Sequence, residues 1–331
     1  FKQKTAYEIY QCDWSSDVCS SDLYLVNDHW RPGVTYPALA LDDATAAIAW
    51  PIPLAEADIS EKDRANPTLD AVVPMQPRRT LVVGSKGQLG RALLEVFPDA
   101  DGVDLDEFDI TDPDAVAGFG WSEYGTILNA AAFTAVDVAE TTEGRRSSWA
   151  ANAVAPALLA KAAIEHGLTL VHYSSDYVFD GTAELHDESE GFAPLGVYAQ
   201  TKAAGDVAVG LAPRHYVLRT SWVIGDGKNF VRTMQDLAGK GVSPSVVDDQ
   251  VGRLTFTDEL VRATRHLLDS GAAYGTYHLS NGGPAMSWRE VAQAVFERSG
   301  RSRDDVSGTT TEAYADGVLA QGKPFAPRPL G

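Results

Sequence analysis

Residues 79–97 read RTLVVGSKGQLGRALLEVF, and this stretch decides which fold the sequence predicts. The apolar, β-branched run at 79–83 predicts a short buried strand, and ALLEVF predicts a helix with one apolar face. Between them Gly84, Gly87 and Gly90 follow the spacing G-x-x-G-x-x-G. A strand, a glycine loop and a helix in this order form the context in which a dinucleotide is bound.

The three glycines have a physical purpose in such a loop. Glycine permits a tight turn and the close approach of a pyrophosphate, and the amino end of the following helix adds partial positive charge. A glycine-rich turn that binds no ligand is the competing interpretation.

Acidic residues follow the loop where a nucleotide would need them. A second short strand is expected to end at Asp104, fourteen residues beyond Gly90, where a carboxylate can accept hydrogen bonds from the adenosine ribose. This position favours NADH, whereas Lys86 in the loop could receive the 2'-phosphate of NADPH, so both cofactors stay open. In the run DITDP, Asp109 and Ile110 either flank the adenine or belong to a plain capped turn.

Alternating strands and helices continue along the chain. Strands are expected at 126–129, 168–173 and from 215, and helices at 147–166, 229–238, 258–268 and 287–299. This alternation predicts an α/β protein with a Rossmann-type doubly wound parallel sheet. The segments from Trp222 onward are expected to form a smaller C-terminal substrate lobe over the carboxyl edge of the sheet, where ligands bind in such folds.

The stretch 168–202 brings a second set of functional groups to that edge. Its strand ends in the hydroxyls of Ser174 and Ser175, and the helix beyond carries Tyr198 and Lys202 four residues apart, on one face. A lysine ammonium beside a phenol lowers the pKa of the phenol from about 10. A serine hydroxyl and Tyr198 could then hold a carbonyl oxygen, which predicts reduction of a ketone. The competing interpretation is a chance Tyr-x-x-x-Lys spacing on a solvated helix face.

The run NAAAFTAVDVAE at 129–140 lies between these two sets. Its three alanines directly follow an expected strand and would let the ribose of a nicotinamide pass close to the backbone. Asp137 and Glu140 either serve this site or lie on a helical surface.

The composition bounds the partners and the location. The chain has 27 basic and 46 acidic residues, and its net charge of -19 argues against nucleic acid or an anionic membrane as a partner. No apolar run reaches the ~18 residues of a membrane span, and no signal-peptide pattern is present. We therefore expect a cytoplasmic protein.

Residues 1–76 do not continue the strand and helix pattern. Segment 1–23 contains both cysteines, Cys12 and Cys19, at a spacing that fits no metal or redox motif, and it resembles a translated sequencing adapter. A disordered native leader is the alternative. Segment 24–76 resembles the C-terminal end of a dTDP-4-dehydrorhamnose 3,5-epimerase through Asp42, Asp43, Ile48, Ala49, Trp50, Pro51, Ile59, Ser60, Lys62 and Asp63. The catalytic histidine of that family would lie upstream, so we expect an inactive remnant that suggests a fused or associated epimerase.

Nine motifs recur in family order within residues 79–329: GSKGQLG, DITD, NAAAFTAVDVAE, HYSSDYVFDG, VYAQTK, LRTSWV, NFVRTM, VVDDQVG and YHLSNGG. On these motifs the segment 77–331 resembles the dTDP-4-dehydrorhamnose reductases, which are extended short-chain dehydrogenases/reductases. The resemblance implies a domain that reduces the C4 ketone of dTDP-4-dehydro-L-rhamnose to dTDP-L-rhamnose with NADPH or NADH.

The resemblance also implies roles for individual residues. Ser175, Tyr198 and Lys202 would be catalytic. With Gly84 and Gly90 of the loop, the cofactor contacts would be Gly87, Gln88, Leu89, Asp104, Asp109, Ile110, Ala132, Phe133, Thr134, Tyr198 and Lys202. The deoxysugar nucleotide would contact Val136, Asp176, Tyr177 and Trp222. Some members bind a metal through an acidic residue just after the third glycine, but Arg91 and Ala92 stand there, so no metal is expected.

The chain departs from the family pattern at three positions of note. Ser175 replaces a usual threonine, Leu254 a usual proline and Ile224 a usual tyrosine. Serine keeps the hydroxyl but lacks the methyl group that fixes its rotamer. Two other functions are kept as alternatives: another extended short-chain dehydrogenase acting on a nucleotide sugar, and a non-catalytic NADP-binding regulatory subunit. The oligomeric state is left open.

Overall fold

The computed structural model describes residues 37–73 and 77–330. The chain divides into two compact units, Phe1–Gln76 and Pro77–Gly331. The adapter-like segment 1–23, and residues 24–36 of the epimerase-like segment, lie outside the described residues.

The described part of the first unit is mostly loop, with one short helix, α1 (Glu61–Arg64). Asp43 organises it, because its carboxylate accepts hydrogen bonds from the backbone N–H groups of Thr45, Ala46 and Leu69 at 2.7 to 2.9 Å. These bonds hold the pKa of the Asp43 carboxyl below its usual range. Ser60 accepts a bond from the backbone of Asp63 and so caps α1.

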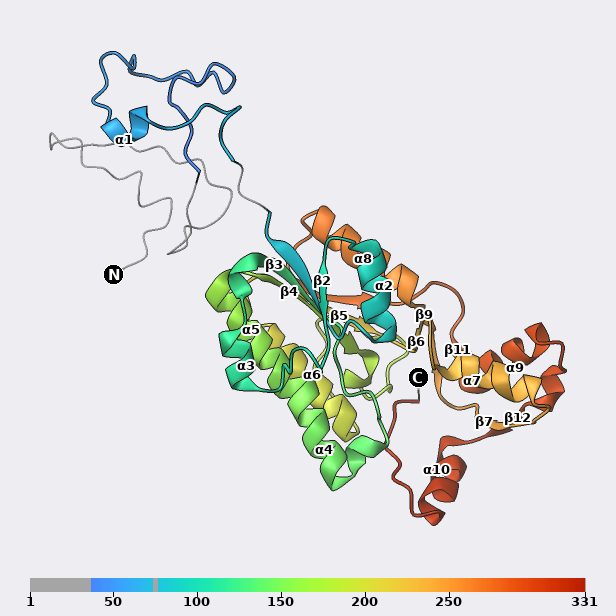
Figure 1. Cartoon of the computed structure of the whole chain (residues 1–331). Helices are drawn as coiled ribbons and strands as arrows, with labels where there is room; N and C mark the ends of the chain where they lie inside the picture. The colour runs from blue at the N-terminus through green and yellow to red at the C-terminus, as the bar shows by residue number, and fades with distance from the viewer. Residues whose placement is uncertain (1–36, 74–76, 331) are drawn as a thin grey trace. The chain divides into compact units, whose positions relative to one another are not determined.

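The second unit is built on a six-stranded sheet in the order β10-β5-β4-β3-β1-β2, with every pair parallel. Its strands are β1 (Arg79–Val83), β2 (Asp101–Val103), β3 (Tyr124–Asn129), β4 (Thr169–Ser175), β5 (His215–Thr220) and β10 (Gly275–Leu279). The order reverses at β1, which makes the sheet doubly wound and confirms the predicted α/β Rossmann-type fold. Figure 1 shows the carboxyl ends of β1, β3, β4 and β5 converging at one edge.

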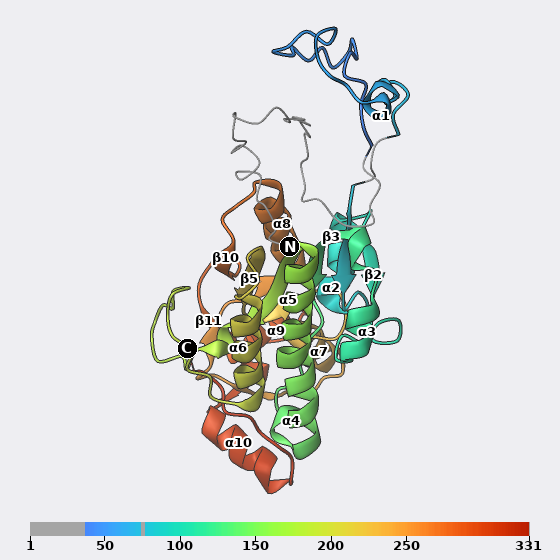
Figure 2. The ribbon, with the colours of Figure 1, turned by 90° about the vertical axis from the view of Figure 1, so that its left-hand side faces the viewer.

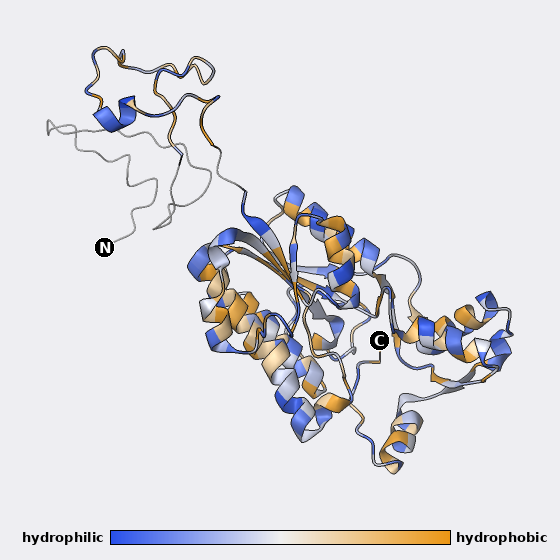
Figure 3. Ribbon diagram, in the orientation of Figure 1, coloured by the Kyte–Doolittle hydropathy of each residue, from blue (hydrophilic) through white to orange (hydrophobic). Residues whose placement is uncertain are grey.

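Helices cover both faces of this sheet (Figures 1 and 2). On one face lie α3 (Pro113–Gly118), α5 (Ala155–His166) and α6 (Val197–Val209), and on the other α2 (Gln88–Val96) and α8 (Thr257–Asp269). Successive strand residues alternate between the two cores: Leu81 and Val83 belong to the first and Val82 to the second. Figure 3 shows the resulting concentration of hydrophobic residues in the strands and along α5.

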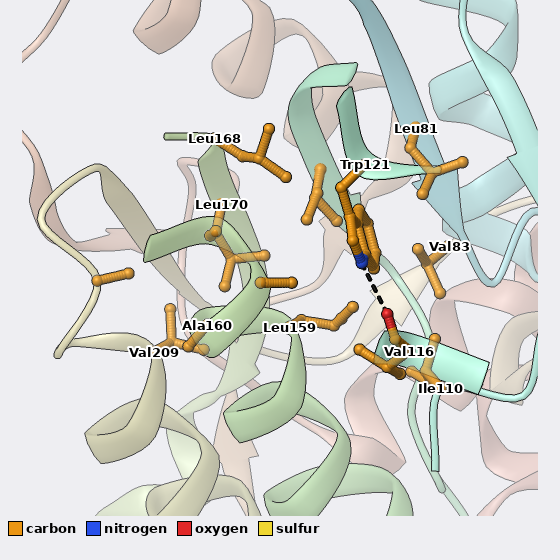
Figure 4. Close-up of a cluster of buried hydrophobic side chains, with 14 of the residues drawn as sticks. Leu81, Val83, Ile110, Val116, Trp121, Leu159, Ala160, Leu168, Leu170 and Val209 are labelled. Carbon is orange, nitrogen blue, oxygen red and sulfur yellow. Dashed lines mark hydrogen bonds between the residues drawn. The ribbon is translucent and has the colours of Figure 1, made fainter. Parts of the chain in front are cut away.

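Trp121 anchors the first core. It is 2% exposed, and its indole Nε1 donates a hydrogen bond of 2.8 Å to the carbonyl of Val116 (Figure 4). The ring of Phe119 lies 4.6 Å from that of Trp121 and stacks on Phe108 at 4.3 Å. This aromatic cluster fills the space beneath β1 and β3 and holds the segment that follows Asp104 against the sheet.

The helix predicted at 147–166 begins earlier than expected. It starts as α4 (Thr142–Trp149), widens into a π-helical segment at Ala150–Val154 and continues as α5, and Figure 2 shows the pieces in one line. Thr141 caps α4 through the backbone N–H of Gly144. The π segment presents Asn152 to the backbone of Phe133, with its amide accepting at 2.8 Å and donating at 3.0 Å.

The segment after Trp222, which is expected from the sequence to form most of the smaller lobe, divides between two regions of the second unit. Helix α8 packs on α2, and β10 pairs with β5, so both belong to the main sheet layer. The lobe itself consists of α7 (Phe230–Gly239) and α9 (Trp288–Arg298) with the strand pair β7 (Ser245–Val247) and β12 (Ser307–Thr309). The short pairs β6 (Val223–Ile224) with β9 (Thr255–Phe256), and β8 (Val251–Gly252) with β11 (Met286–Ser287), connect it to the sheet.

The remaining elements are short turns of 3-10 helix and one terminal helix. They are η1 (Trp121–Glu123), η2 (Val138–Glu140), η4 (Asp176–Val178), η5 (Arg303–Asp305) and α10 (Thr311–Ala320). Within residues 37–73 and 77–330, no helix is both long and apolar enough to cross a membrane.

Candidate active site

The glycine loop between β1 and α2 has no room for a side chain at Gly84 or Gly90. Gly84 has φ +79°, and a Cβ there would lie 2.6 Å from the backbone nitrogen of Ala131. A Cβ on Gly90 would lie 2.1 Å from the carbonyl oxygen of Gly84. Gly87 precedes α2, whose amino end receives no side-chain cap. The loop therefore offers bare backbone and a helix amino end, and these fit the diphosphate of a dinucleotide.

Two residues predicted to contact the cofactor also tie the loop to its surroundings. The side-chain oxygen of Gln88 accepts hydrogen bonds of 3.2 Å from the backbone of Gly225 and from the amide of Asn229. Leu89 packs against the core under α2 and α8. Gln88 thus links the loop to the start of the smaller lobe.

Asp104 stands at the end of β2, beside the loop. One carboxylate oxygen accepts from the backbone N–H of Lys86 at 2.8 Å, and the other from Leu105 at 2.9 Å. The ammonium of Lys86 is bonded to Asp106 at 2.5 Å and to Glu107 at 2.8 Å. The bond to Asp106 is the main cause of the raised pKa of Lys86 and of the lowered pKa of the Asp106 carboxyl. Lys86 therefore already has two carboxylate partners.

The side chains of the DITDP turn form local hydrogen bonds, including the cap of α3. Asp109 accepts from the backbone and the hydroxyl of Thr111, and Asp112 caps α3. Ile110 is 6% exposed and lies in the core with Phe108. The side chain of Ile110 is thus packed in the core, and its contact with the adenine stays a prediction.

The run after β3 passes close to the glycine loop. Ala132 and Thr134 are exposed, and Phe133 is fixed by its two hydrogen bonds to Asn152. Because β3 lies beside β1 in the sheet, these residues stand at the same edge as the loop. The structure thus brings the predicted contacts Ala132, Phe133 and Thr134 near Gly84.

Ser175, Tyr198 and Lys202 meet where β4 ends and α6 begins. Ser175 is the last residue of β4, and its hydroxyl donates to the carboxylate of Asp176 at 3.0 Å and accepts from the backbone of Tyr177 at 3.2 Å. Tyr198 and Lys202 lie one turn apart on α6, as the spacing predicted. Glu140 accepts from the first N–H of α6, that of Val197, at 2.8 Å. Glu140 therefore holds the start of this helix and does not lie on a free helical surface.

The phenol of Tyr198 differs from the prediction in its electrostatics. Burial, followed by the charge of Asp176, raises its pKa, while the Ser175 hydroxyl acts weakly in the opposite direction. The Nζ atom of Lys202 donates to the carbonyl of Tyr173 at 2.6 Å and lies 3.4 Å from Nε2 of His172. In this state Tyr198 is a neutral phenol and so a proton donor.

Asp176 and Tyr177 form the wall beside Tyr198. Burial raises the pKa of the half-buried Asp176 carboxyl to about 6 and that of the Tyr177 phenol to about 12. The rings of Tyr177 and Tyr198 meet edge to face at 6.1 Å. Val136 lies in the loop after β3, with its N–H bonded to the carbonyl of Thr134 at 3.0 Å.

Trp222 has a strained backbone, with φ +41°. Its ring stacks on that of Trp288 at 3.6 Å and an interplanar angle of 15°. A Cβ on Gly252 would lie 3.0 Å from the Trp222 ring, so the ring packs closely on the backbone of Gly252. Phe230 packs on Trp288 at 4.5 Å, which connects Trp222 to the core of the smaller lobe.

Asn152, Trp288 and Arg328 also belong to this region, and no sequence motif pointed to them. Arg328 donates to the carboxylate of Asp137 at 2.8 Å, and its charge acts on the Tyr177 phenol. Asp137 also accepts from the backbone of Ala326 at 3.0 Å, so it holds the C-terminal segment beside the candidate substrate residues. Residues 37–73 and 77–330 contain no group of three or more His, Cys, Asp or Glu that could hold a metal ion.

A doubly wound sheet with a bare glycine loop after β1, and with a serine, a tyrosine and a lysine at the ends of β4 and α6, defines the class of short-chain dehydrogenases/reductases. Residues 78–320 match the family described as the RmlD substrate binding domain, and the chain belongs to that family.

Its relatives agree with this assignment. The chain is 37% identical over 235 residues to "dTDP-4-dehydrorhamnose reductase" of Aggregatibacter actinomycetemcomitans, a match that covers 67% of this chain and 79% of the relative. It is 38% identical over 248 residues to the protein of that name from Mycolicibacterium smegmatis, with 71% and 74% covered. A "probable dTDP-4,6-dihydroxy-2-methyloxan-3-one 4-ketoreductase" of Streptomyces antibioticus is 38% identical, with 71% and 82% covered.

Solved structures show the same fold. A dTDP-4-dehydrorhamnose reductase from Clostridium acetobutylicum superposes with a TM-score of 0.68 at 35% identity, covering 76% of this chain and 88% of that one. The corresponding Bacillus anthracis structure, in complex with NADP, gives a TM-score of 0.67 at 32% identity, with 76% and 96% covered.

Proposed function

We propose that this protein reduces the C4 ketone of dTDP-4-dehydro-L-rhamnose to dTDP-L-rhamnose, with NADPH or NADH as the reductant. The observation that carries this proposal is the position of Tyr198, Ser175 and Lys202 at the same sheet edge as the glycine loop. The names of the relatives support the substrate, and the NADP complex of the Bacillus anthracis protein supports the cofactor.

Each of the three candidate catalytic residues has its own role in this reaction. The bound nicotinamide supplies the hydride. Tyr198, a half-buried and neutral phenol, donates its proton to the ketone oxygen as the alkoxide develops. The Ser175 hydroxyl adjoins that phenol and orients the carbonyl. Lys202, on the same face of α6, binds the ribose and stabilises the phenolate left on Tyr198.

The sugar nucleotide is proposed to lie between η4 and the smaller lobe. Asp176 and Tyr177 would contact the deoxysugar from one side, together with Val136, and Trp222 would pack on it from the other. One carboxylate oxygen of Asp176 accepts from the Ser175 hydroxyl, and a carboxylate can accept several hydrogen bonds, so Asp176 would also accept from a sugar hydroxyl.

The carboxylates around Lys86 should set the cofactor preference. Because Asp106 and Glu107 occupy the Lys86 ammonium, we expect the Asp106→Asn, Glu107→Gln double variant to release it for a 2'-phosphate. The ratio of NADPH to NADH affinity should then rise by about tenfold, the value of one added charge-assisted bond. Dissociation constants from intrinsic fluorescence would measure this ratio.

The control for this prediction is a change of charge elsewhere on the surface. Glu165→Gln removes an exposed partner of Lys161 on α5 and should leave the ratio unaltered. An unchanged ratio of NADPH to NADH affinity in the double variant would show that Lys86 does not bind the 2'-phosphate of the cofactor.

Two alternatives remain for comparison. Another extended short-chain dehydrogenase acting on a nucleotide sugar would share the fold, and the Streptomyces antibioticus relative bears the name of a ketoreductase of a different dTDP sugar. A non-catalytic NADP-binding regulatory subunit would share the glycine loop but would not need the Tyr198 phenol.

The test supplies dTDP-4-dehydro-L-rhamnose from a separate epimerase and follows NADPH and NADH oxidation with and without that epimerase. We expect oxidation only when the epimerase is present. Oxidation with another dTDP-4-keto sugar alone would favour the first alternative, and cofactor binding without any turnover would favour the regulatory subunit.

The first unit is proposed to be a separate remnant. Residues 24–76 are interpreted as the inactive end of an epimerase ahead of the reductase domain at 77–331, and residues 1–23 as a non-native segment. The backbone bonds accepted by Asp43 and the cap formed by Ser60 give these two positions structural purposes, which supports a remnant that keeps local order. The proposed reaction would take place in the cytoplasm.

A further inference from the structure

Three polar side chains from three elements form a buried line beside the candidate catalytic residues. Asn129 at the end of β3, His172 on β4 and Lys202 on α6 are 1%, 0% and 1% exposed. The sheet register places Asn129 directly opposite His172. The amide nitrogen of Asn129 lies 3.1 Å from His172 Nδ1, and Lys202 Nζ lies 3.4 Å from His172 Nε2.

A backbone amide sets the direction of every hydrogen bond in this line. The N–H of Ala131, which can only donate, bonds to the side-chain oxygen of Asn129 at 3.3 Å. The Asn129 NH₂ group therefore faces His172 and donates to Nδ1. A neutral imidazole that accepts at Nδ1 carries its hydrogen on Nε2, which points at Lys202.

Lys202 must accept from that N–H while it donates to the carbonyl of Tyr173 at 2.6 Å. An ammonium has three donors and no lone pair, whereas a neutral amine can do both. Burial also keeps the imidazole neutral, since it lowers the pKa of His172 well below its usual value. The pattern of donors and acceptors is thus complete only with an uncharged lysine.

We propose that His172 is a positioning residue that holds Lys202 as a neutral amine in the cofactor-free enzyme at alkaline pH, and that binding of the nicotinamide dinucleotide is then coupled to the uptake of one proton at Lys202. The lysine nitrogen takes this proton from solvent, and the new ammonium donates to the ribose and faces Tyr198. The inference rests on the proposed role of Lys202 toward the cofactor and adds to it a charge state and a residue that sets it.

The charged groups around Lys202 are consistent with this state. Burial lowers the pKa of Lys202 to about 8, and the charge of Asp206, one turn further along α6, acts in the opposite direction. Asp206 is paired with the buried Arg219 of β5 at 3.0 Å, so it is not a free counter-ion for the lysine. The other titratable neighbours are Tyr198, a neutral phenol, and Asp176, which faces Tyr198.

The sign of the coupling follows from these groups. Below about pH 7 the free lysine already carries its proton, so binding takes up none. Above about pH 8 the free lysine is largely neutral, and binding that requires the ammonium must take up a proton. Cofactor affinity should therefore decline by up to tenfold per pH unit above this value, while affinity at lower pH stays constant.

Two measurements test the inference without the sugar substrate. In the free protein at about pH 9, ¹⁵N NMR of the seven histidines, with His172 assigned by its loss in His172→Gln, should show a neutral ring protonated at Nε2. Calorimetry of NADH binding in buffers of different ionisation heat should show uptake of close to one proton at about pH 9 and none at about pH 6.5. A ring protonated at Nδ1, or binding without proton uptake at the higher pH, would overturn it.

The variant Asn129→Asp should reverse the direction of the hydrogen bonds between residue 129, His172 and Lys202. A carboxylate would accept from Nδ1–H of His172, which makes Nε2 an acceptor and stabilises the lysine ammonium before the cofactor arrives. Proton uptake at about pH 9 should then fall to near zero, with His172 protonated at Nδ1. A switched ring with undiminished uptake would contradict the role of His172. A protein that shows the uptake yet reduces no dTDP-4-keto sugar would refute the proposed function and leave this inference standing.

Discussion

Replacement of Tyr198 by phenylalanine is expected to lower the turnover rate of ketone reduction by about 10² to 10⁴-fold, the range of general acid catalysis. The phenol is the half-buried proton donor beside Ser175, and without its hydroxyl the developing alkoxide has no partner of suitable pKa. Cofactor affinity should change by less than about threefold, because Lys202 and the glycine loop are untouched. Single-turnover oxidation of NADPH measures the chemical step directly.

The aromatic ring itself has a structural neighbour, the edge-to-face contact with Tyr177 at 6.1 Å, and phenylalanine preserves it. The matched control is Tyr274→Phe, a half-exposed tyrosine at the opposite edge of the sheet whose hydroxyl accepts from Arg214. It should turn over at the normal rate. A Tyr198→Phe enzyme of near-normal rate would remove Tyr198 from the mechanism and favour a proton donor such as Asp176.

The parts of this site that sequence reasoning found are those fixed by local spacing. Gly84, Gly87 and Gly90 sit within one turn, and Tyr198 and Lys202 lie one helical turn apart, so their geometry follows from strand and helix periods. The alternation of strands and helices likewise determined the parallel sheet, since crossover connections leave few arrangements.

What the sequence did not reveal depends on contacts between distant segments. Arg328 and Asp137 are bonded although they lie 191 positions apart in the sequence. Trp288 and Trp222 are brought together by the packing of the smaller lobe. Asn152 lies in an alanine-rich helix, and nothing in its neighbours signals the π segment that turns it toward Phe133.

Electrostatics was the other source of error. The spacing of Tyr198 and Lys202 predicted a lowered phenol pKa, but a helix spacing does not say which atom the ammonium or amine bonds. In the folded chain the carbonyl of Tyr173 and the ring of His172 hold the Lys202 nitrogen, and burial dominates the phenol. The two groups that hold the Lys202 nitrogen, Tyr173 and His172, belong to β4. The spacing of residues along α6 carries no information about them.

A methyl group on Gly90 should have an effect of similar size on cofactor binding. The Cβ of Gly90→Ala would lie 2.1 Å from the carbonyl oxygen of Gly84 and 2.7 Å from Cα of Ser85, and both are backbone atoms that no rotamer change can move. The loop can relieve this overlap only by opening between β1 and α2. We expect a cost of about 3 kcal/mol, the upper part of the range for overpacking, and hence about 100-fold weaker binding of NADPH and NADH.

Gly317→Ala is the matched control, because a Cβ at Gly317, inside α10, meets nothing within 4 Å. That substitution should leave affinity unchanged and stabilise α10 by about 0.5 to 1 kcal/mol. Titration of intrinsic fluorescence with each cofactor, beside thermal unfolding of both variants, separates loss of the loop from loss of the fold. If Gly90→Ala unfolds normally and binds both cofactors at wild-type affinity, the loop between β1 and α2 does not hold the diphosphate. Tight binding would then require another anion site, and the position of Lys202 relative to the cofactor would have to be derived from that site.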